Sequence, residues 1–242
     1  MASNSSIEWT DATWNPVTGC TQVSPGCDHC YALTFAERFR NVHGHYFEGG
    51  FDLKLRPNML EMPRRWRLPR RVFVNSMSDL FHVAVPDEYI DLVFDEMERV
   101  DRHVYQVLTK RPERMRRYVR NRYGPLVVPS QIWLGVSVES NDYAWRVDML
   151  REVNASVRFL SVEPMLGPVD QVDLSGVSWV IAGGESGHSY RRLDIEWVRE
   201  LRDRCVALGV RFFFKQWHKG NTGRMLDGRT WDDMPFLPAA FA

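Results

Sequence analysis

The sequence predicts an α/β fold: a single-domain, partial βα barrel of about six to seven parallel strands. Short apolar runs rich in Val, Ile, Phe and Trp recur along the chain, and stretches of helical periodicity separate them. The runs are continuous rather than alternating, which is typical of parallel strands buried on both faces. A chain of 242 residues with 44% apolar content can bury such a core as one domain, 1–242.

The first strand is expected at 12–17, directly before a cysteine-rich loop at 19–31, and a helix should begin near residue 30. The segment 44–68 is long and irregular, and we expect it to form a surface insertion. The remaining strands are expected at 72–75, 104–109, 132–137, 157–161, 179–182 and 211–215. The cysteine-rich loop is therefore predicted to be the loop after the first strand.

Two crossover helices have the clearest signals. Asp87 is expected to cap the first, and Asp194 the second, which should end at Gly209. Apolar residues recur at helical spacing on one face of each. These faces carry Ile90, Phe94, Met97 and Val100 in the first helix and Trp197, Leu201, Cys205 and Leu208 in the second. Cys205 is therefore expected to be a buried structural thiol.

Three of the four cysteines, Cys20, Cys27 and Cys30, lie in one short segment. Three thiolates can ligate a [4Fe-4S] cluster and leave one iron open to a substrate or cofactor, whereas four would close it. The spacing does not resemble a secreted disulfide framework, so a metal or redox site in a reducing compartment is indicated. We expect a cytoplasmic protein.

Zinc is the alternative occupant, with His29, His43 and His45 as further candidate ligands. Structural zinc takes four ligands, commonly in short paired spacings, and only the pair Cys27-x-x-Cys30 has such a spacing here. The sequence therefore favours the cluster.

Polar residues follow every one of the six later apolar runs. In parallel βα architectures the carboxyl ends of the strands and the loops after them carry the active site. We therefore expect one rim that also holds the cysteine-rich loop. Its candidate residues are Asn75, Ser76, Asp79, Lys110, Ser137, Glu139, Glu163, Gly183, Gly184, Glu185 and Lys215.

These motifs resemble known proteins. The three-cysteine loop with Tyr31 after the last cysteine, followed by βα units, is similar to the radical S-adenosylmethionine superfamily, although its first gap has six residues rather than the usual three. More closely, the chain resembles a phage-associated and bacterial family of undefined function that is placed beside spore photoproduct lyase-like proteins. The shared motifs are TWNPVTGC (13–20), SPGCDHCY (24–31), VEP (162–164) and AGGESG (182–187).

The resemblance implies a partial barrel similar to a TIM barrel and two cofactors, a [4Fe-4S] cluster and S-adenosylmethionine. Cys20, Cys27 and Cys30 would hold the cluster, and S-adenosylmethionine would occupy the open iron. An electron donor would drive its cleavage to a 5′-deoxyadenosyl radical, which abstracts hydrogen from a substrate. Nucleic-acid repair or modification is one use of such a radical.

The resemblance and the chemistry of S-adenosylmethionine together assign roles at the rim. Asn75, Ser76 and Asp79 are expected at the amino-acid end, with Lys110 near the carboxylate. The ribose is expected beside Ser137 and Glu139, the adenine beside Tyr31, and the ammonium near Gly183, Gly184 and Glu185. Tyr31 as a core residue and the two glycines as a turn remain alternatives. The candidate catalytic residues are Lys110, Glu163 and Lys215.

The charge of the chain is a weaker indicator of function than the cysteine motif. Lys plus Arg and Asp plus Glu both number 31, so overall basicity does not indicate a nucleic-acid-binding protein. Two local segments, Arg64–Arg71 and Arg111–Arg122, mix arginine with aromatics and suit contact with nucleic acid, although a solvated helix face explains them equally well. No apolar run approaches the roughly 18 residues of a membrane span.

Two further functions stay open beside the radical enzyme. One is a nucleic-acid-binding protein whose iron-sulfur or zinc site is structural. The other is a cluster enzyme that does not use S-adenosylmethionine.

Overall fold

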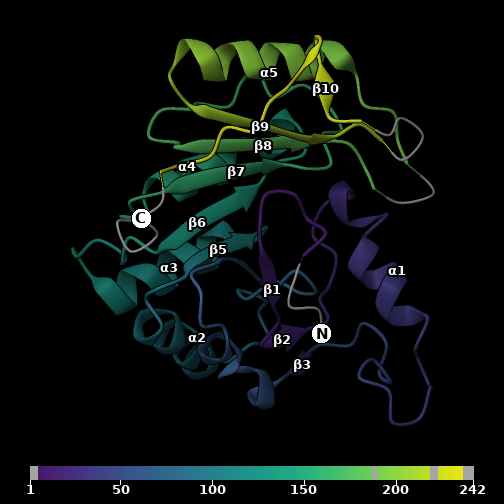
Figure 1. Ribbon diagram of the computed structural model, residues 1–242, viewed down its shortest axis with the longest axis vertical. Coiled ribbons are helices and arrows are strands. Elements are labelled where there is room, and N and C mark those ends of the chain that lie inside the picture. The colour runs from purple at the N-terminus through teal and green to yellow at the C-terminus, as the bar shows by residue number, and fades with distance from the viewer. Residues whose placement is uncertain (1–4, 187–189, 219–222, 237–242) are drawn as a thin grey trace.

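The computed structural model describes residues 5–186, 190–218 and 223–236. Its centre is a seven-stranded parallel sheet in the order β1-β4-β5-β6-β7-β8-β9. The sheet curls, with α2, α3 and α5 outside it (Figure 1). Its strands are β1 (Ala12–Trp14), β4 (Arg71–Val74), β5 (Val104–Thr109), β6 (Ile132–Ser137), β7 (Arg158–Val162), β8 (Trp179–Gly183) and β9 (Arg211–Gln216). The predicted fold class is confirmed.

The first strand is shorter than predicted. It ends at Trp14, because Pro16 has no amide hydrogen to continue a ladder. The chain then forms β2 (Val17–Thr18), which leaves the main sheet and pairs antiparallel with β3 (Lys54–Leu55). The prediction of one strand over 12–17 is therefore wrong after residue 14.

The segment 44–68 contains β3 and two 3₁₀ turns, η2 (Pro57–Met59) and η3 (Met62–Arg65). Leu53, Leu55, Leu60 and Met62 pack against the main core, and the Trp14 indole donates a hydrogen bond to the Met59 carbonyl at 2.7 Å. The inner side of this segment is thus part of the core. The expectation of a single domain over 1–242 stays a prediction.

The two helices with clear sequence signals are present as α2 (Asp87–Arg99) and α5 (Ile195–Ala207). Asp194 caps α5 by accepting from the Glu196 amide at 2.9 Å, as predicted. The prediction for Asp87 is wrong: it is the first helical residue, with Pro86 at the cap position, and it binds Arg114 instead.

The buried face of α2 was predicted correctly, whereas that of α5 was predicted only in part. Ile90, Phe94, Met97 and Val100 are all buried. In α5, Leu201 and Cys205 are buried, but Leu208 lies beyond the helix and is 62% exposed. Burial raises the pKa of the Cys205 thiol to about 12, which agrees with a structural role.

Three shorter or unpredicted helices complete the set. The helix near residue 30 is α1 (Tyr31–Glu37), and α3 (Pro112–Tyr123) and α4 (Trp145–Arg151) follow β5 and β6. Two 3₁₀ turns, η1 (Pro25–Cys27) and η4 (Asn141–Tyr143), and a hairpin of β10 (Met225–Leu226) and β11 (Arg229–Thr230) are the remaining elements. No helix in the described part of the chain is long and apolar enough to cross a membrane.

The concave face of the sheet has a large-to-small gradient along the strands. Bulky residues fill its lower part, where Trp9, Phe73, Trp133, Phe159, Trp179 and Phe213 form one buried cluster. Side chains on one face of a strand recur every second residue. On this face β6 continues from Trp133 through Gly135 to Ser137, and β7 from Phe159 to Ser161. The small residues leave space toward the carboxyl ends of the strands.

Substitution of Gly135 tests this packing. A Cβ added there would lie 2.6 Å from the Phe159 ring, so Gly135→Ala should lower the free energy of unfolding by about 1 to 3 kcal/mol through overpacking. Phe159→Leu should recover part of this loss in the Gly135→Ala background. Urea denaturation measures both, with Leu126→Ala, at a residue 68% exposed, as a control expected within about 0.5 kcal/mol of wild type. An unchanged stability of Gly135→Ala would contradict the packing.

Candidate functional site

A cavity of about 630 Å³ lies at the carboxyl ends of the strands, a size typical of ligand sites. All three clustered cysteines line it, together with the N-terminal residues Ser5–Trp9. Two predicted rim residues, Glu139 and Gly183, are not among the lining residues. The predicted residues that do line it are Tyr31, Asn75, Ser76, Asp79, Lys110, Ser137, Glu163, Gly184, Glu185 and Lys215.

The cysteine-rich loop is held against the segment that follows α1. Gly19 has φ +84°, and a Cβ there would lie 2.2 Å from the Asp52 carbonyl oxygen, so only glycine fits. Cys20 and Cys30 pack against a small apolar cluster that includes Ala36, Phe47 and Phe51. The cysteines are partly exposed, and they face the cavity from this apolar support.

Asp79 connects the end of β4 to Cys20. Its carboxylate accepts hydrogen bonds from the Thr109 hydroxyl at 2.8 Å and from Arg111 Nη1 at 3.0 Å. Arg111 Nη1 also lies 3.5 Å from Cys20 Sγ, and its Nη2 donates to the Thr21 carbonyl at 2.9 Å. Burial, with the charge of Asp79, raises the pKa of the Cys20 thiol to about 11, so metal binding there must displace a proton.

Glu139, just after β6, connects to the middle of the loop. Oε1 accepts from the Ser24 hydroxyl at 2.7 Å and from Lys110 Nζ at 2.6 Å, and Oε2 accepts from Arg146 Nη1 at 3.0 Å. Its side chain is 1% exposed. Burial acts to raise the pKa of this carboxyl, but Lys110 and Arg146 outweigh it, so the pKa of Glu139 is lowered and the group is charged.

Glu185, after β8, holds the last part of the loop. It accepts from His29 Nδ1 at 3.1 Å and from the Arg191 amide at 2.6 Å, and the Arg191 guanidinium also binds it. Arg191 Nη2 donates in turn to the Pro25 carbonyl at 2.8 Å. These donors outweigh the effect of burial and hold the pKa of Glu185 below its usual range. The predicted contact of Glu185 with an ammonium stays a prediction.

Asn75 and Glu163, unlike the three acidic residues above, each have a buried side-chain atom without a hydrogen bond in the described part of the chain. Asn75, at the end of β4, has φ +61°, a conformation that asparagine tolerates better than most residues. Its side-chain Nδ2 and Glu163 Oε1 have no hydrogen-bond partner within the described residues. Lys215 Nζ lies 2.9 Å from Glu163 Oε1, but it is not aligned for a hydrogen bond. Among the described residues, Asn75 therefore has an unused donor and Glu163 an ion pair without an aligned hydrogen bond, and both residues line the cavity, which fits a polar cofactor beside the cysteines.

The histidines considered for zinc have other partners. His29 binds Glu185, His43 is exposed and lies 3.5 Å from Glu48, and His45 stacks on Phe39. Among the described residues no three His, Cys, Asp or Glu side chains are grouped so as to hold one metal ion. A cluster places each thiolate on a different iron, so its ligands do not need to meet at one point.

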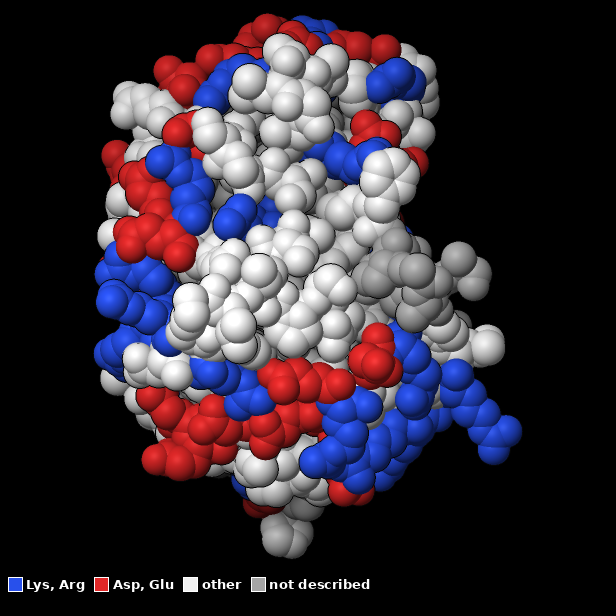
Figure 2. Space-filling model, turned by 90° about the vertical axis from the view of Figure 1, so that its left-hand side faces the viewer, with Lys and Arg blue, Asp and Glu red and all other residues white. Residues whose placement is uncertain are grey.

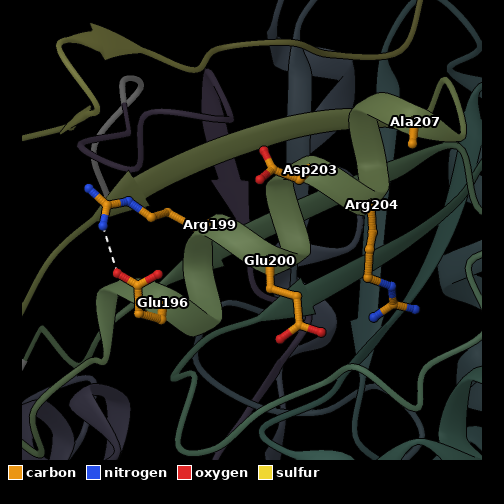
Figure 3. Close-up of a pocket in the computed structure, with 6 residues that line it drawn as sticks. All are labelled: Glu196, Arg199, Glu200, Asp203, Arg204 and Ala207. Carbon is orange, nitrogen blue, oxygen red and sulfur yellow. Dashed lines mark hydrogen bonds and ion pairs between the residues drawn. The ribbon is translucent and has the colours of Figure 1, made fainter.

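A second hollow lies on the outer surface of α5 and is lined by residues of that helix alone (Figure 3). It carries both acidic and basic side chains, and Arg199 Nη1 donates to Glu196 at 2.6 Å. It contains no cysteine and no aromatic residue. Ligand sites are mostly apolar and concave, so the cavity at the strand ends is the better candidate.

The two basic segments lie in different places. Arg64–Arg71 leads into the start of β4, at the end of the strand opposite Asn75. On the face in Figure 2, acidic and basic side chains surround a broad central area of other residues, and one larger basic area lies at the lower right. In Arg111–Arg122, Arg116 pairs with Glu152, and Arg122 pairs with three acidic residues. Nucleic-acid contact by either segment stays a prediction.

The sequence assigned no connecting role to the residues that join the strand ends to the loop, although it placed Arg111 among the polar residues that follow 104–109. The connecting residues are Ser24, Arg111, Arg146 and Arg191. Ser24 lies within the SPGCDHCY motif and Arg111 follows the candidate Lys110, so both had a positional signal. Arg146 and Arg191 had none.

Residues 4–235 match a family model described as "Protein of unknown function (DUF5131)". The chain belongs to this family. The expectation of a family of undefined function is therefore confirmed. A comparison with curated proteins found no match.

Two solved structures are similar in fold at low identity. One is spore photoproduct lyase complexed with dinucleoside spore photoproduct, at 14% identity and a TM-score of 0.46. The match covers 78% of this chain and 58% of that one, so the chain spans just over half of its length. The other is a point mutant of spore photoproduct lyase, at 12% identity and a TM-score of 0.49, covering 83% of this chain and 75% of that one.

The Glu185 interactions give a pH-dependent prediction. Glu185→Gln should lower the free energy of unfolding near pH 7 by about 2 kcal/mol, because it removes the charge that binds Arg191 and His29. The pKa of Glu185 is lower in the folded chain than its unfolded value of about 4.3, so this stabilisation is complete above that value. It is lost as the pH falls through the folded pKa.

Urea titrations of wild type and Glu185→Gln at a series of pH values measure this difference, which should shrink toward acid. Glu152→Gln is the matched control, because Glu152 forms an exposed ion pair and should contribute at most about 1 kcal/mol. A difference that stays constant at all pH values would contradict the role of the Glu185 charge.

Proposed function

We propose that this protein is a radical S-adenosylmethionine enzyme with a [4Fe-4S] cluster on Cys20, Cys27 and Cys30. One observation carries the proposal: three thiols and the polar ends of the central strands meet in one cavity. When bound, the cluster and S-adenosylmethionine supply a one-electron cleavage that yields a 5′-deoxyadenosyl radical. An electron donor is a required partner.

The wall of the cavity supplies groups for the cofactor's polar parts. Asn75 Nδ2 is buried without a partner, and Ser76 lies next to it on the rim, which supports their role at the amino-acid end. Asp79 supports that role through Arg111, which it holds close to Cys20. Lys110 lines the cavity and provides a positive charge for a carboxylate.

Other lining residues suit the nucleoside part. Ser137 lines the cavity and is our candidate for the ribose, with Glu139 two residues further along the chain and outside the lining. The Tyr31 hydroxyl donates to the Ser76 carbonyl at 2.5 Å, and 48% of this residue is exposed, so its ring is available to an adenine. Gly184 lines the cavity, and a Cβ there would lie 3.0 Å from the His218 amide nitrogen, so a glycine lets β8 and the segment after β9 pack closely. A Cβ at Gly183 would lie 3.1 Å from Glu163 Oε1.

Glu163 and Lys215 are the candidate groups for the substrate. They lie 2.9 Å apart on the cavity wall with opposite charges, and Glu163 Oε1 has no hydrogen bond in the described structure. A substrate group that replaces this contact can accept from Lys215 or donate to Glu163. The aromatic cluster below, including Trp9 and Phe73, closes the cavity floor, which keeps water from a reactive intermediate.

The cysteines provide the direct test. Wild-type protein reconstituted without oxygen should bind about four irons per chain and absorb near 400 nm, and on reduction it should form 5′-deoxyadenosine. Cys20→Ala, Cys27→Ala and Cys30→Ala should each lose the cluster and the product. Cys205→Ala is the matched control and should keep both, because Cys205 is buried in α5 away from the cavity. A wild-type protein that is colourless and binds only zinc would refute the proposal.

A nucleic-acid-binding protein with a structural metal site is the second candidate. The observation that favours it is the exposure of Arg64, Arg65 and Arg67 beside one another. Arg64 is paired with Glu96, whereas Arg65 and Arg67 extend from the same turn into solvent. Two exposed arginines suit phosphate contact.

The double variant Arg65→Glu/Arg67→Glu should weaken binding of single-stranded DNA and reduce the salt slope of binding by about 1 to 2. Fluorescence anisotropy over a range of salt concentrations measures both quantities. The double variant Arg151→Glu/Arg199→Glu is the charge-matched control, because Arg151 is paired with Asp173 and Arg199 with Asp227. Equal binding by all three proteins would contradict a role for Arg64–Arg71.

A further inference from the structure

The long gap between Cys20 and Cys27 lies directly on Glu139. The Ser24 hydroxyl donates to Glu139 Oε1 at 2.7 Å, and a Cβ added at Gly26 would lie 2.6 Å from Glu139 Cγ and Oε1. One contact is a hydrogen bond to a buried charge, and the other is close packing of the loop on the same side chain. Both fix the backbone immediately before Cys27.

Glu139 is itself fixed from the sheet side. It follows β6, and Arg146, which is 1% exposed, binds both its Oε2 and the Ser137 carbonyl. Lys110, at the end of β5, binds its Oε1. The carboxylate therefore cannot move without breaking contacts to two cations in a region of low dielectric.

We propose that Glu139 is a positioning residue that holds the loop between Cys20 and Cys27 so that Cys27 faces the cavity. This positioning would align a thiolate for the cluster, and that purpose rests on the proposed function. The position of the loop is a property of the chain without any cluster. The geometry also accounts for the six residues between Cys20 and Cys27. The residues beyond the usual three extend the loop to the Glu139 carboxylate below the rim.

The charges support this role. Lys110 and Arg146 together carry one positive charge more than Glu139 neutralises, and Lys110 also lines the cavity. Three thiolate ligands bring negative charge to the same place. The positive charge of the group formed by Lys110, Arg146 and Glu139 is therefore complementary to a loop that carries the iron-sulfur cluster. The same ion pairs are present without the cluster.

Thiol reactivity in the metal-free protein tests the position of the loop. Alkylation rates of Cys27 and Cys205 are measured separately by mass spectrometry of their peptides. In Ser24→Ala and in Glu139→Gln, Cys27 should react about tenfold faster than in wild type, the change expected for losing one hydrogen bond to a buried charge. Cys205 is buried and should react slowly in all of them, so it reports global unfolding.

Glu152→Gln is the control for Glu139→Gln and should leave the Cys27 rate unchanged. If Glu139→Gln exposes Cys205, that variant has unfolded and Gly26→Ala decides. This variant keeps both cations on Glu139 and also keeps the Ser24 hydroxyl, which lies 4.0 Å from Cys27 Sγ. Gly26→Ala should give the same increase by pushing the loop off the carboxylate. A wild-type Cys27 rate in the folded variants would overturn the proposal.

Reconstitution then separates this inference from the proposed function. If the cluster forms, the reduced wild-type protein and Ser24→Ala should differ in their electron paramagnetic resonance spectra, and Ser24→Ala should retain less iron per chain. Identical spectra and iron content would overturn the positioning role. If wild type binds no cluster, the proposed function fails, while the alkylation rates still decide whether Glu139 fixes the loop.

Discussion

A carboxylate removed from water needs hydrogen-bond donors, and this requirement shapes the candidate site. Asp79, Glu139 and Glu185 lie near the ends of three parallel strands, and each is almost fully buried. Each accepts from a donor in the cysteine-rich loop or from an arginine that also holds this loop. Their other donors include Thr109, Lys110 and Arg146. The register of the sheet thus determines the path of a loop that has little regular structure of its own.

The same sheet creates the space that the loop covers. Residues on one face of a strand alternate with residues on the other, so each strand contributes a column of side chains to the concave face. Aromatic residues occupy the lower positions, and Ser137 and Ser161 occupy the upper ones. A closed floor and an open upper layer follow from this order of large and small residues along each strand.

The strands of this fold could be predicted because parallel strands are apolar on both faces, and their ends indicated most of the cavity wall. Local polar chemistry was harder to predict. The chain leaves the sheet at Asn15-Pro16, and the cap of α2 is Pro86 rather than Asp87. In the site, the sequence did not distinguish the engaged Glu139 and Glu185 from Glu163, because their partners Arg146 and Arg191 are brought close by the fold.

The first described residues have a practical consequence for anyone preparing this protein. Ser5–Trp9 line the cavity, and the Ser5 amide donates to the Asp11 carbonyl at 2.9 Å, so the chain is anchored as it enters the site. A purification tag attached a few residues ahead of Ser5 therefore begins close in sequence to the cavity wall. The choice of which end carries the tag affects access to the cysteines, and a tag removed to a short scar is the safer design.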